Sequence, residues 1–392
     1  MIKLEKAISL AAQHLLRPGT ETLPLEKTMH RILAEDVLAD RDVPPFHRST
    51  MDGYACRRED LPGPLKVLET IEAGTLPGQA VDSGQCSKIM TGAMVPEGAD
   101  CVVMKEYMEK EPDGSVLFTG NETDTHIDPR GQDLRQGELL LKRGTWITPG
   151  HMGIMASVGK IRVKVSRRIR VGILATGSEL VDAGQQPEGA QIRNSNSYQL
   201  AALVEHAGHK ALDIGMVEDN SGLIAERITT GLEKADLLLM TGGASVGELD
   251  LVPGVLKDLG LHLEFDRVAM QPGKPVSFAH GKGNACFGLS GNPVSSFVQF
   301  ALLVRPYLEL CSGATPPHRR IRMILEKGFQ RKHADRQFFL PVLFTETGTC
   351  EPVSYHGSGH LHALSRATGF AEIPAGQLAL EKGALVYVRL IK

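Results

Sequence analysis

The residues of this chain that could do chemistry lie where apolar runs end in glycine-rich or polar turns. Residues 170–175, 211–217, 237–240 and 286–289 are such runs, and the turns after them contain Thr176, Glu179, Asp219, Gly242, Gly243, Ser245, Asp250 and Asn292. A glycine-rich turn before a helix exposes backbone N–H groups where the helix dipole favours an anion. The turns therefore predict a site for a phosphate or another oxyanion, although one such turn alone is as often only a tight connection.

Three of these residues, Glu179, Asp219 and Asp250, are carboxylates. They would repel an anion bound at the same turns unless a cation lay between them. Mg²⁺ takes oxygen ligands from one or two carboxylates together with substrate phosphates. We therefore predict that these three residues are metal ligands and take part in catalysis.

The segments between the apolar runs have the spacing of amphipathic helices. Apolar residues recur every three or four positions in residues 194–207 and 223–235. Strands that alternate with helices predict a doubly wound, mostly parallel sheet that is covered on both faces. The carboxyl ends of parallel strands meet at one edge of the sheet, where ligands usually bind. We therefore expect all four turns to line one crevice.

A rigid turn with a positive charge lies at residues 271–275. Two prolines and a glycine fix the sequence Gln271-Pro272-Gly273-Lys274-Pro275, from which Lys274 projects. A lysine on a turn is usually only solvated. Held between prolines and beside phosphate-type turns, Lys274 is a better anion ligand than most.

The N-terminal part of the chain has a different pattern. Spacing and capping signals predict helices at residues 3–16, at about 29–38 and from Pro149 to about 159. Short β-like runs from about residue 65 to 141 predict a small β domain, and similar runs after residue 317 predict a further one. The loop at residues 44–55 contains Asp52, and an acid in such a loop is more often a turn former than a functional group.

Composition narrows the class of protein. The chain has 392 residues, 42% of them hydrophobic and 23% charged, which is ordinary for a globular protein of two to four domains. The net charge of -3 gives no reason to expect nucleic acid or membrane partners, and the basic run at residues 160–170 alternates like a solvated strand face. The six cysteines form no C-x-x-C pair, which argues against zinc or disulfides. We find no stretch of membrane-span length and no leader, so we expect a cytoplasmic location.

Eight motifs carry a resemblance to a known family. They are STMDGYA, IMTGAMVPEGADCVVMKE, RGQDL, ILATGSELV, IRNSNSYQL, TGGASVGELD, QPGKP and GLSGNPVSSF. In this order and at roughly this spacing they resemble the MoeA-type molybdopterin molybdenumtransferases, which are similar to the E domain of gephyrin. The resemblance covers nearly the whole chain. No single motif is decisive, but eight in order are highly specific.

The resemblance implies a multidomain α/β plus β fold with four parts. Residues 1–45 and 142–168 would form part I, a dimerisation region, and residues 46–141 part II, an inserted small β domain. Residues 169–315 would form part III, a doubly wound α/β domain of the molybdopterin-binding type, and residues 316–392 part IV, a C-terminal domain like a β barrel. It further implies a homodimer in which part III of one subunit and part II of the other share a cleft.

The family reaction implied is the insertion of molybdate into adenylylated molybdopterin, which releases AMP and molybdenum cofactor with the help of Mg²⁺. Two partner classes follow, a molybdopterin adenylyltransferase and apo-molybdoenzymes. The resemblance implies a catalytic role for Asp52, Asp133, Glu179, Asp219 and Asp250. Substrate or molybdate would be bound by Thr91, Thr176, Gly242, Gly243, Ser245, Gln271, Gly273, Lys274, Asn292, Ser295, Arg336 and Ser358.

Two departures from the family pattern bear on the anion site. Gln271 stands where the PGKP turn often has a lysine before it, which removes one positive charge. Ser290 stands where the GNP turn usually has a proline, and we expect the turn to survive this change. Three alternatives stay open: a molybdopterin adenylyltransferase, an enzyme that inserts tungstate, and a scaffold without catalytic activity that binds peptides.

Overall fold

The computed structural model describes residues 1–242, 251–281, 283–314 and 320–391. These residues divide into two compact units. The larger unit contains Met1–Glu35, Arg143–Thr148 and Arg162–Lys392, and the smaller unit contains Asp36–Lys142 and Pro149–Ile161. The fold class expected from the sequence, α/β with additional β structure, is confirmed, whereas the boundaries of the four parts stay predictions.

A six-stranded sheet forms the centre of the larger unit. Its order is β16-β13-β17-β21-β20-β18, with bounds Lys210–Val217, Arg170–Thr176, Leu237–Thr241, Ala285–Leu289, Pro275–His280 and His262–Arg267. The first four strands are parallel, and β20 is antiparallel to both of its neighbours. These four are the strands that the apolar runs predict. β18 and β20 are strands that the sequence analysis missed.

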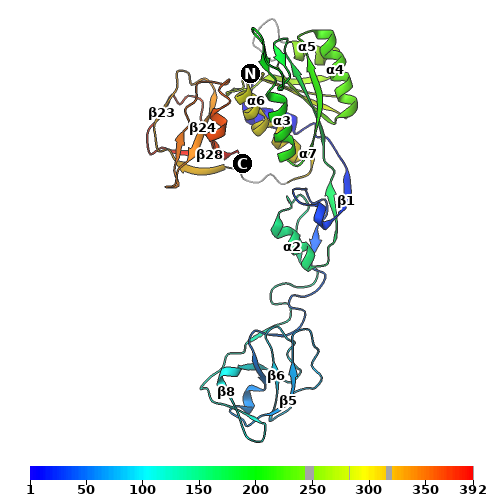
Figure 1. Cartoon of the computed structure of the whole chain (residues 1–392), viewed down its shortest axis with the longest axis vertical. Coiled ribbons are helices and arrows are strands. Elements are labelled where there is room, and N and C mark those ends of the chain that lie inside the picture. Colours follow the sequence, from blue (N-terminus) through cyan, green and yellow to red (C-terminus); the bar gives the residue numbers. More distant parts are fainter. Residues whose placement is uncertain (243–250, 282, 315–319, 392) are drawn as a thin grey trace. The chain divides into compact units, whose positions relative to one another are not determined.

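Helices cover both faces of this sheet (Figure 1). In β17, Leu237 and Leu239 pack into one core cluster and Leu238 and Met240 into another, because successive side chains of a strand point to opposite faces. The first cluster includes α1 (Leu4–Ala11), α3 (Asn196–His206), α6 (Pro293–Gln299) and α7 (Arg305–Cys311). The second includes α4 (Ser221–Lys234) and α5 (Leu251–Asp258). The doubly wound arrangement is therefore confirmed.

The helices α6 and α7 are continuous through a π-helical stretch, η4 (Phe300–Val304). Contrary to the sequence analysis, this helix has the length and hydropathy of a membrane span over Pro293–Cys311. However, 72% of its apolar window is buried inside the protein. It packs against the central sheet as a core helix, and its amino end meets the carboxyl end of β21.

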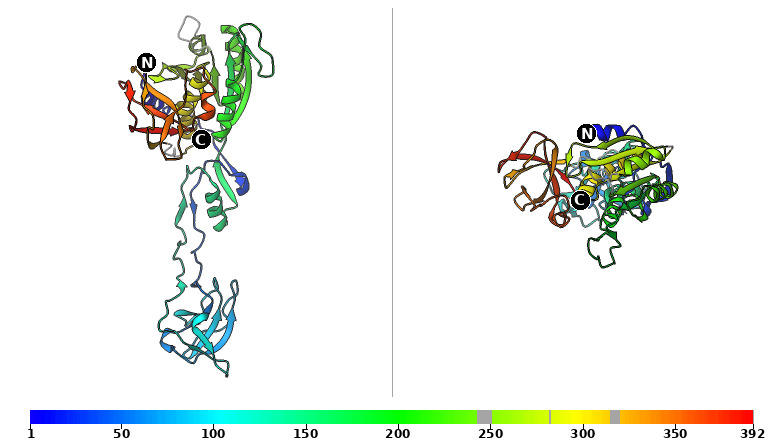
Figure 2. Two further views of the ribbon diagram at one scale, coloured as in Figure 1. Left: turned by 60° about the vertical axis from the view of Figure 1, so that its left-hand side comes forward. Right: turned by 90° about the horizontal axis from the view of Figure 1, so that it is seen from above.

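The C-terminal strands, coloured orange to red in Figure 2, form most of a second large sheet. The order is β19-β24-β26-β28-β22, and β25 pairs with β24. Its strands are Met270–Gln271 (β19), Arg320–Ile324 (β22), Gln337–Phe344 (β24), Cys350–Pro352 (β25), Gly369–Ile373 (β26) and Leu385–Leu390 (β28). The same region contains a separate pair, β23 (Phe329–Gln330) with β27 (Ala379–Leu380), and the helix α8 (Ala363–Arg366). Since β19 follows β18 directly, this sheet includes a strand from the α/β region, next to the predicted lysine turn.

Short elements complete the larger unit. β1 (Thr20–Pro24) pairs antiparallel with β12 (Arg162–Ser166), β14 (Leu180–Val181) pairs with β15 (Ile192–Arg193), and η1 is Leu25–Lys27. In β12 the valines are buried and the arginine and lysine are exposed, which is the solvated strand face that the basic run predicts.

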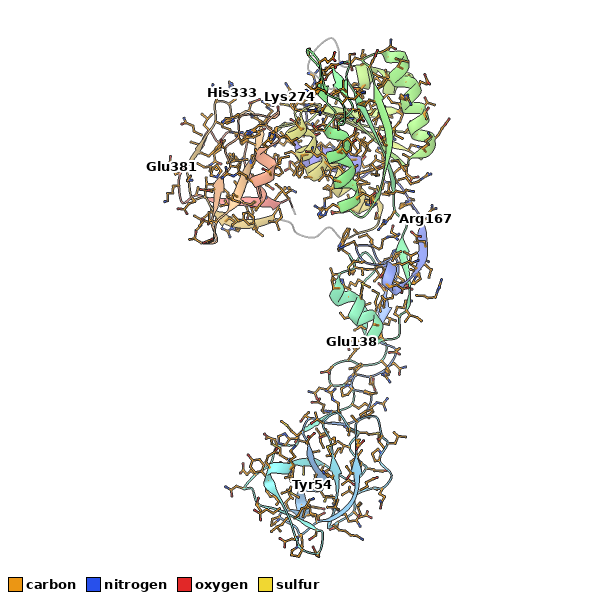
Figure 3. The ribbon with its side chains drawn as sticks, viewed as in Figure 1. Tyr54, Glu138, Arg167, Lys274, His333 and Glu381 are labelled. Atoms are coloured by element: carbon orange, nitrogen blue, oxygen red, sulfur yellow. The ribbon has the colours of Figure 1, made fainter. Side chains whose placement is uncertain are left out.

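The smaller unit is built on a four-stranded sheet in the order β5-β6-β4-β7. These strands are Lys66–Ile71, Gln85–Ile89, Gly53–Cys56 and Cys101–Met104. Its other elements are β2 (Val37–Leu38), β3 (Arg48–Ser49), η2 (Arg58–Asp60), η3 (Lys105–Tyr107), β8 (Met108–Lys110), β9 (Val116–Phe118), β10 (Ile127–Asp128), β11 (Leu139–Leu141) and α2 (Pro149–Ser157). Tyr54, labelled in Figure 3, is buried in this unit.

Two helix predictions need correction. The helix expected at residues 3–16 ends at Ala11, and the helix expected at about 29–38 is absent from this described segment. There, Ile32 and Leu33 form isolated bridges with Trp146 and Val165, and β2 pairs with β11. Backbone pairing with residues more than 100 positions away overrides the local helical spacing.

Candidate active site

A cavity of about 1100 Å³ opens at the carboxyl edge of the central sheet. All four predicted turns contribute to it: Thr176 at the end of β13 and Glu179 after it, Asp219 after β16, Gly242 after β17, and Asn292 after β21. The lysine turn and Arg336, Tyr355 and Ser358 from the C-terminal region line the same cavity. Of the substrate-binding residues predicted from the sequence, Gln271, Gly273, Lys274 and Ser295 also line it. The crevice expected from the topology is therefore present.

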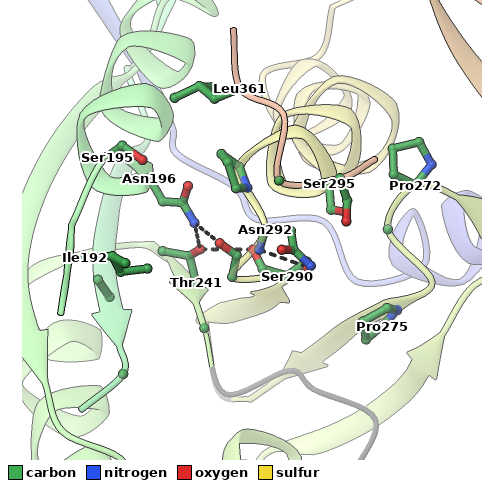
Figure 4. A pocket seen from close by; sticks show the side chains of 18 of the residues that line it. Ile192, Ser195, Asn196, Thr241, Pro272, Pro275, Ser290, Asn292, Ser295 and Leu361 are labelled. Atoms are coloured by element: carbon green, nitrogen blue, oxygen red, sulfur yellow. Dashed lines mark hydrogen bonds between the residues drawn. The ribbon is translucent and has the colours of Figure 1, made fainter. Parts of the chain in front are cut away.

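A buried hydrogen-bond network ties two of these turns together (Figure 4). The amide nitrogen Nδ2 of Asn196, at the start of α3, donates to Thr241 Oγ1 and to the carbonyl of Gly291, both at 2.8 Å. Thr241 Oγ1 donates in turn to the carbonyl of Ser290 at 3.1 Å. The bonds of Thr241 are buried and the bond to Gly291 is partly buried, so this network fixes the spacing of the β17 and β21 turns.

Some buried polar atoms at the cavity lack a protein partner among the described residues. They are Thr176 Oγ1, Asn196 Oδ1 and Gln271 Oε1, and all three residues line the cavity. Buried polar groups in native proteins are nearly always hydrogen-bonded to protein, water or ligand. These atoms therefore suit a ligand that carries hydrogen-bond donors.

Glycine is required where the turns approach one another. Gly242 has φ of +101°, and a Cβ there would lie 1.9 Å from the carbonyl oxygen of Thr176. Gly273 has φ of +97°, and a Cβ there would lie 2.9 Å from Gln299 Cγ. Any other residue would be strained at both positions and would push the cavity walls apart.

Gln299 is fully buried in α6. It joins the turn after β21, which contains Ser290, to the lysine turn at residues 271–275. Its Oε1 accepts from the backbone N–H of Ser290 at 2.8 Å, and its Nε2 donates to the carbonyls of Gly273 and Pro275 at 3.0 and 2.6 Å. Ser290 Oγ accepts from the backbone N–H of Asn292 at 3.2 Å. The turn thus keeps its place before α6 with serine in the position of the family's proline.

The side of the cavity toward the C-terminal sheet carries two basic side chains, of which Arg336 is ion-paired through its Nε with Asp335 Oδ2 at 3.1 Å. Lys274 and Arg336 line it, and the amino end of the helix that begins at Pro293 points its dipole toward it. The backbone N–H of Val294 donates to the carbonyl of Ser358 at 3.0 Å, which fixes that loop against the helix. Burial raises the pKa of Tyr355 to about 12, so its hydroxyl remains protonated at neutral pH.

The opposite side carries the exposed carboxylates of Glu179 and Asp219. Their turns are joined because the N–H of Gly177 donates to the carbonyl of Val217 at 3.1 Å and the N–H of Asp219 donates to Ser178 Oγ at 3.2 Å. The possible metal ligands on this side are carboxylate oxygens, and oxygen ligands suit Mg²⁺. The third predicted ligand, Asp250, lies outside the described residues, as do Gly243 and Ser245.

Asp52, Thr91 and Asp133 belong to the smaller unit. Asp52 accepts from the backbone N–H and the hydroxyl of Thr91 at 2.9 and 2.8 Å, and Lys105 Nζ lies 3.5 Å away. The backbone N–H of Thr91, followed by its hydroxyl, holds the pKa of Asp52 below its usual value. Asp133 is exposed on a turn. Asp52 and Thr91 therefore form a preorganised anionic group at the surface of this unit.

Sequence reasoning missed Asn196, Thr241 and Gln299 as parts of the site. All three act through hydrogen bonds to residues distant in the sequence. Asn196 and Thr241 lie within motifs that carried the resemblance, IRNSNSYQL and TGGASVGELD, which was the signal available. Gln299 lies two residues beyond the last motif and had no such signal.

The fold and the cavity define an α/β enzyme domain of the molybdopterin-binding type, since residues 172–310 match the family described as "Probable molybdopterin binding domain". Residues 2–159 match "MoeA N-terminal region (domain I and II)" and residues 322–391 match "MoeA C-terminal region (domain IV)". The chain belongs to the molybdopterin molybdenumtransferases, a family of enzymes. The resemblance found in the motifs is thereby confirmed.

Relatives match along the full chain. The molybdopterin molybdenumtransferase of Bacillus subtilis is 34% identical over 405 residues, covering 100% of this chain and 94% of the relative. That of Haemophilus influenzae is 35% identical and covers 94% of each chain. A crystal structure of the molybdopterin biosynthesis MoeA protein from Pyrococcus horikoshii is 32% identical, covers 100% of this chain and 99% of that one, and superposes with a TM-score of 0.85.

Proposed function

We propose that this enzyme inserts molybdenum into molybdopterin, with molybdate and adenylylated molybdopterin as substrates and molybdenum cofactor and AMP as products. The full-length similarity to molybdopterin molybdenumtransferases supports the molybdenum insertion. The observation that carries the choice of substrates is the cavity, which has a cationic side and a carboxylate side at one sheet edge. Such a cavity suits an oxyanion and a pyrophosphate bridge together.

The cationic side is the proposed oxyanion site. Molybdate needs positive charge and hydrogen-bond donors more than it needs a nucleophile. Lys274 supplies a point charge, Arg336 a planar set of N–H donors, and the helix that begins at Pro293 its positive dipole end. Ser295 and Ser358 add hydroxyl groups that line the same cavity. The proposed role of these residues is to hold molybdate for insertion into molybdopterin.

The carboxylate side is the proposed phosphate and metal site. Glu179 and Asp219, with Asp250, would hold Mg²⁺, which neutralises charge on the phosphate oxygens when bound. The carboxylates would also orient a water for cleavage of the phosphoanhydride, with AMP as the leaving group. In this proposal the chain positions the reacting groups and forms no covalent intermediate with the substrate.

We further propose a homodimer in which Asp52, Thr91 and Asp133 of one subunit complete the site of the other. Support comes from the exposed Asp52–Thr91 group, whose hydrogen bonds hold an ionised carboxylate ready at the surface of the smaller unit. A molybdopterin adenylyltransferase would supply the substrate and apo-molybdoenzymes would receive the product, in the cytoplasm.

Incubation of the purified chain with adenylylated molybdopterin, molybdate and Mg²⁺ tests this function. We expect AMP in step with reconstitution of an apo-molybdoenzyme, and replacement of molybdate by tungstate measures the metal preference. At limiting molybdate, Lys274→Ala is expected to lose most of its activity, whereas the matched control Lys332→Ala, which changes an exposed lysine outside the cavity lining, is expected to keep it. Formation of adenylylated molybdopterin from ATP, without insertion, would instead identify an adenylyltransferase.

A further inference from the structure

A second group of metal-ligating side chains lies away from the cavity. Among the residues that the structure describes, His14, Glu264 and His280 bring three ligand atoms within 4.8 Å of one another. A fourth side chain, His262, places its Nε2 3.5 Å from the same Glu264 oxygen. β20 begins at Pro275, which lines the cavity, and ends at His280, so the cluster lies at the opposite edge of the sheet.

Three elements hold the cluster. His262 and His280 are direct partners in the antiparallel pairing of β18 with β20, and an irregularity in that pairing follows Leu263. Glu264 lies in this irregularity, and its Oε1 is 3.5 Å from Nε2 of His262 on the same strand. His14 follows α1, and its carbonyl accepts a hydrogen bond at 2.8 Å from the hydroxyl of Tyr307, a residue only 2% exposed. The position of His14 is therefore anchored in the core.

The distances within the cluster match those of a metal centre. The Nε2 atoms of His14, His280 and His262 lie 3.0, 3.1 and 3.5 Å from Glu264 Oε1. Two ligand atoms of a tetrahedral zinc site, with bonds of about 2.0–2.1 Å, lie roughly 3.3 Å apart. The rings of His14 and His280 are stacked at 3.6 Å between centroids with an interplanar angle of 13°, so one ring would have to turn for both Nε2 lone pairs to point at a single ion.

Hydrogen bonds alone cannot pair all three imidazole nitrogens with the one carboxylate oxygen of Glu264. Three imidazole nitrogens approach one carboxylate oxygen, which has only two lone pairs for donors. One divalent cation would replace the competing protons and bind all four groups at once. The side chains of His14, Glu264 and His280 are 31%, 15% and 21% exposed, so a metal ion can reach them from solvent and keep a water ligand.

We propose that His14, Glu264 and His280, with His262 as a fourth ligand, form a site for a divalent transition metal of the zinc type. Imidazole and carboxylate ligands suit such ions, whereas Mg²⁺ prefers oxygen ligands alone. The site would join the N-terminal segment to β18 and β20, and bound metal would stabilise the folded chain.

The test is a titration of the metal-free full-length chain with Zn²⁺ by calorimetry, with excess Mg²⁺ present to occupy the carboxylate side of the cavity. We expect one strong site in the wild type and in the control variant His333→Ala, whose exposed histidine lies in the C-terminal region (Figure 3). His14→Ala and His280→Gln are expected to weaken Zn²⁺ binding by more than the roughly 10- to 100-fold that loss of a supporting residue costs. Zn²⁺ should raise the thermal midpoint of the wild type and not that of His280→Gln.

His262→Ala provides a variant in which folding is not at risk, because this side chain is 71% exposed. It is expected to weaken Zn²⁺ binding less than His280→Gln does. Equal Zn²⁺ affinity in wild type and all three cluster variants, or no strong site in the wild type, would overturn the proposal. Neither readout depends on molybdopterin chemistry, so the result is independent of the proposed function.

Discussion

At the scale of single residues, Lys274 and Gln271 make the sharpest contrast in the proposed oxyanion site. A charge-assisted hydrogen bond contributes roughly 1.5–3 kcal/mol, and an ordinary one about 1 kcal/mol. Lys274→Ala should therefore raise the molybdate concentration needed for half-maximal AMP release by roughly one to two orders of magnitude. Gln271→Ala should raise it much less, and Gln271→Lys should lower it. An unchanged molybdate dependence in Lys274→Ala would assign that turn a structural role only.

The proposed role of Asp219 in metal binding can be distinguished from any effect of the acid beside it. Asp219→Asn should leave the fold intact, because this side chain is exposed, and should lower Mg²⁺-dependent turnover on the order of 10²-fold. Glu218→Gln is the matched control, since Glu218 is the adjacent exposed acid and does not line the cavity. Turnover is measured at limiting and saturating Mg²⁺. Equal losses in both variants would place the effect outside metal binding.

His209 makes stability depend on pH. It is 5% exposed, and burial followed by the charges of Arg168 and Arg31 lowers its pKa from 6.5 to about 4. Its Nδ1 accepts from the N–H of Ile169 at 3.3 Å, so the fold holds the neutral ring. The unfolded chain binds the proton below about pH 6.5, so this residue reduces stability as pH falls from 6.5 to 4, by about 3 kcal/mol in total.

Urea unfolding of the wild type and of His209→Gln between pH 7.5 and pH 4 measures this effect. The wild-type free energy of unfolding should fall more steeply below pH 6.5 than that of the variant. His333→Gln, which changes an exposed histidine, should follow the wild type. Parallel curves for wild type and His209→Gln would show that this ring is not the titrating group.

Residues that end an apolar run could be found from the sequence, whereas those that act across the fold could not. Thr176, Asp219 and Asn292 stand at the ends of strands. The apolar runs locate these strands and the turn residues mark where they end, so the sequence indicates that the three residues share one edge of the sheet. Asn196 binds the carbonyl of Gly291, 95 positions away, and Gln299 binds three turn residues through one amide. Nothing in local spacing indicates such partners.

At the scale of elements, the four parallel strands and their helices were predictable from local sequence patterns. The strands are continuous apolar runs, and the helices have apolar residues every three or four positions. β18 and β20 were missed because their runs are short and contain charged or proline positions. The helix expected at about 29–38 was wrong because residues 32–38 pair with residues 139–165. The elements that depend on distant partners are thus the ones that local patterns misjudge.

At the scale of the whole molecule, the proposed homodimer makes a testable claim about shared sites. An Asp52→Ala subunit lacks a group in the smaller unit, and an Asp219→Ala subunit lacks one in the larger unit. In a mixed dimer one of the two sites is intact, so full exchange of two inactive variants should restore about a quarter of wild-type activity. Activity is measured after the variants are mixed and allowed to exchange. No recovery would place both acids in a site of one subunit.

The most direct test of the central claim is the coupling between AMP release and molybdenum insertion in a single turnover. Enzyme in excess over adenylylated molybdopterin, with Mg²⁺, is mixed with and without molybdate, and AMP and molybdenum cofactor are quantified. We predict one AMP for each cofactor formed, with AMP release dependent on molybdate and slowed in Lys274→Ala. AMP release at the same rate without molybdate, or without cofactor formation, would contradict the assignment of this cavity to molybdenum insertion.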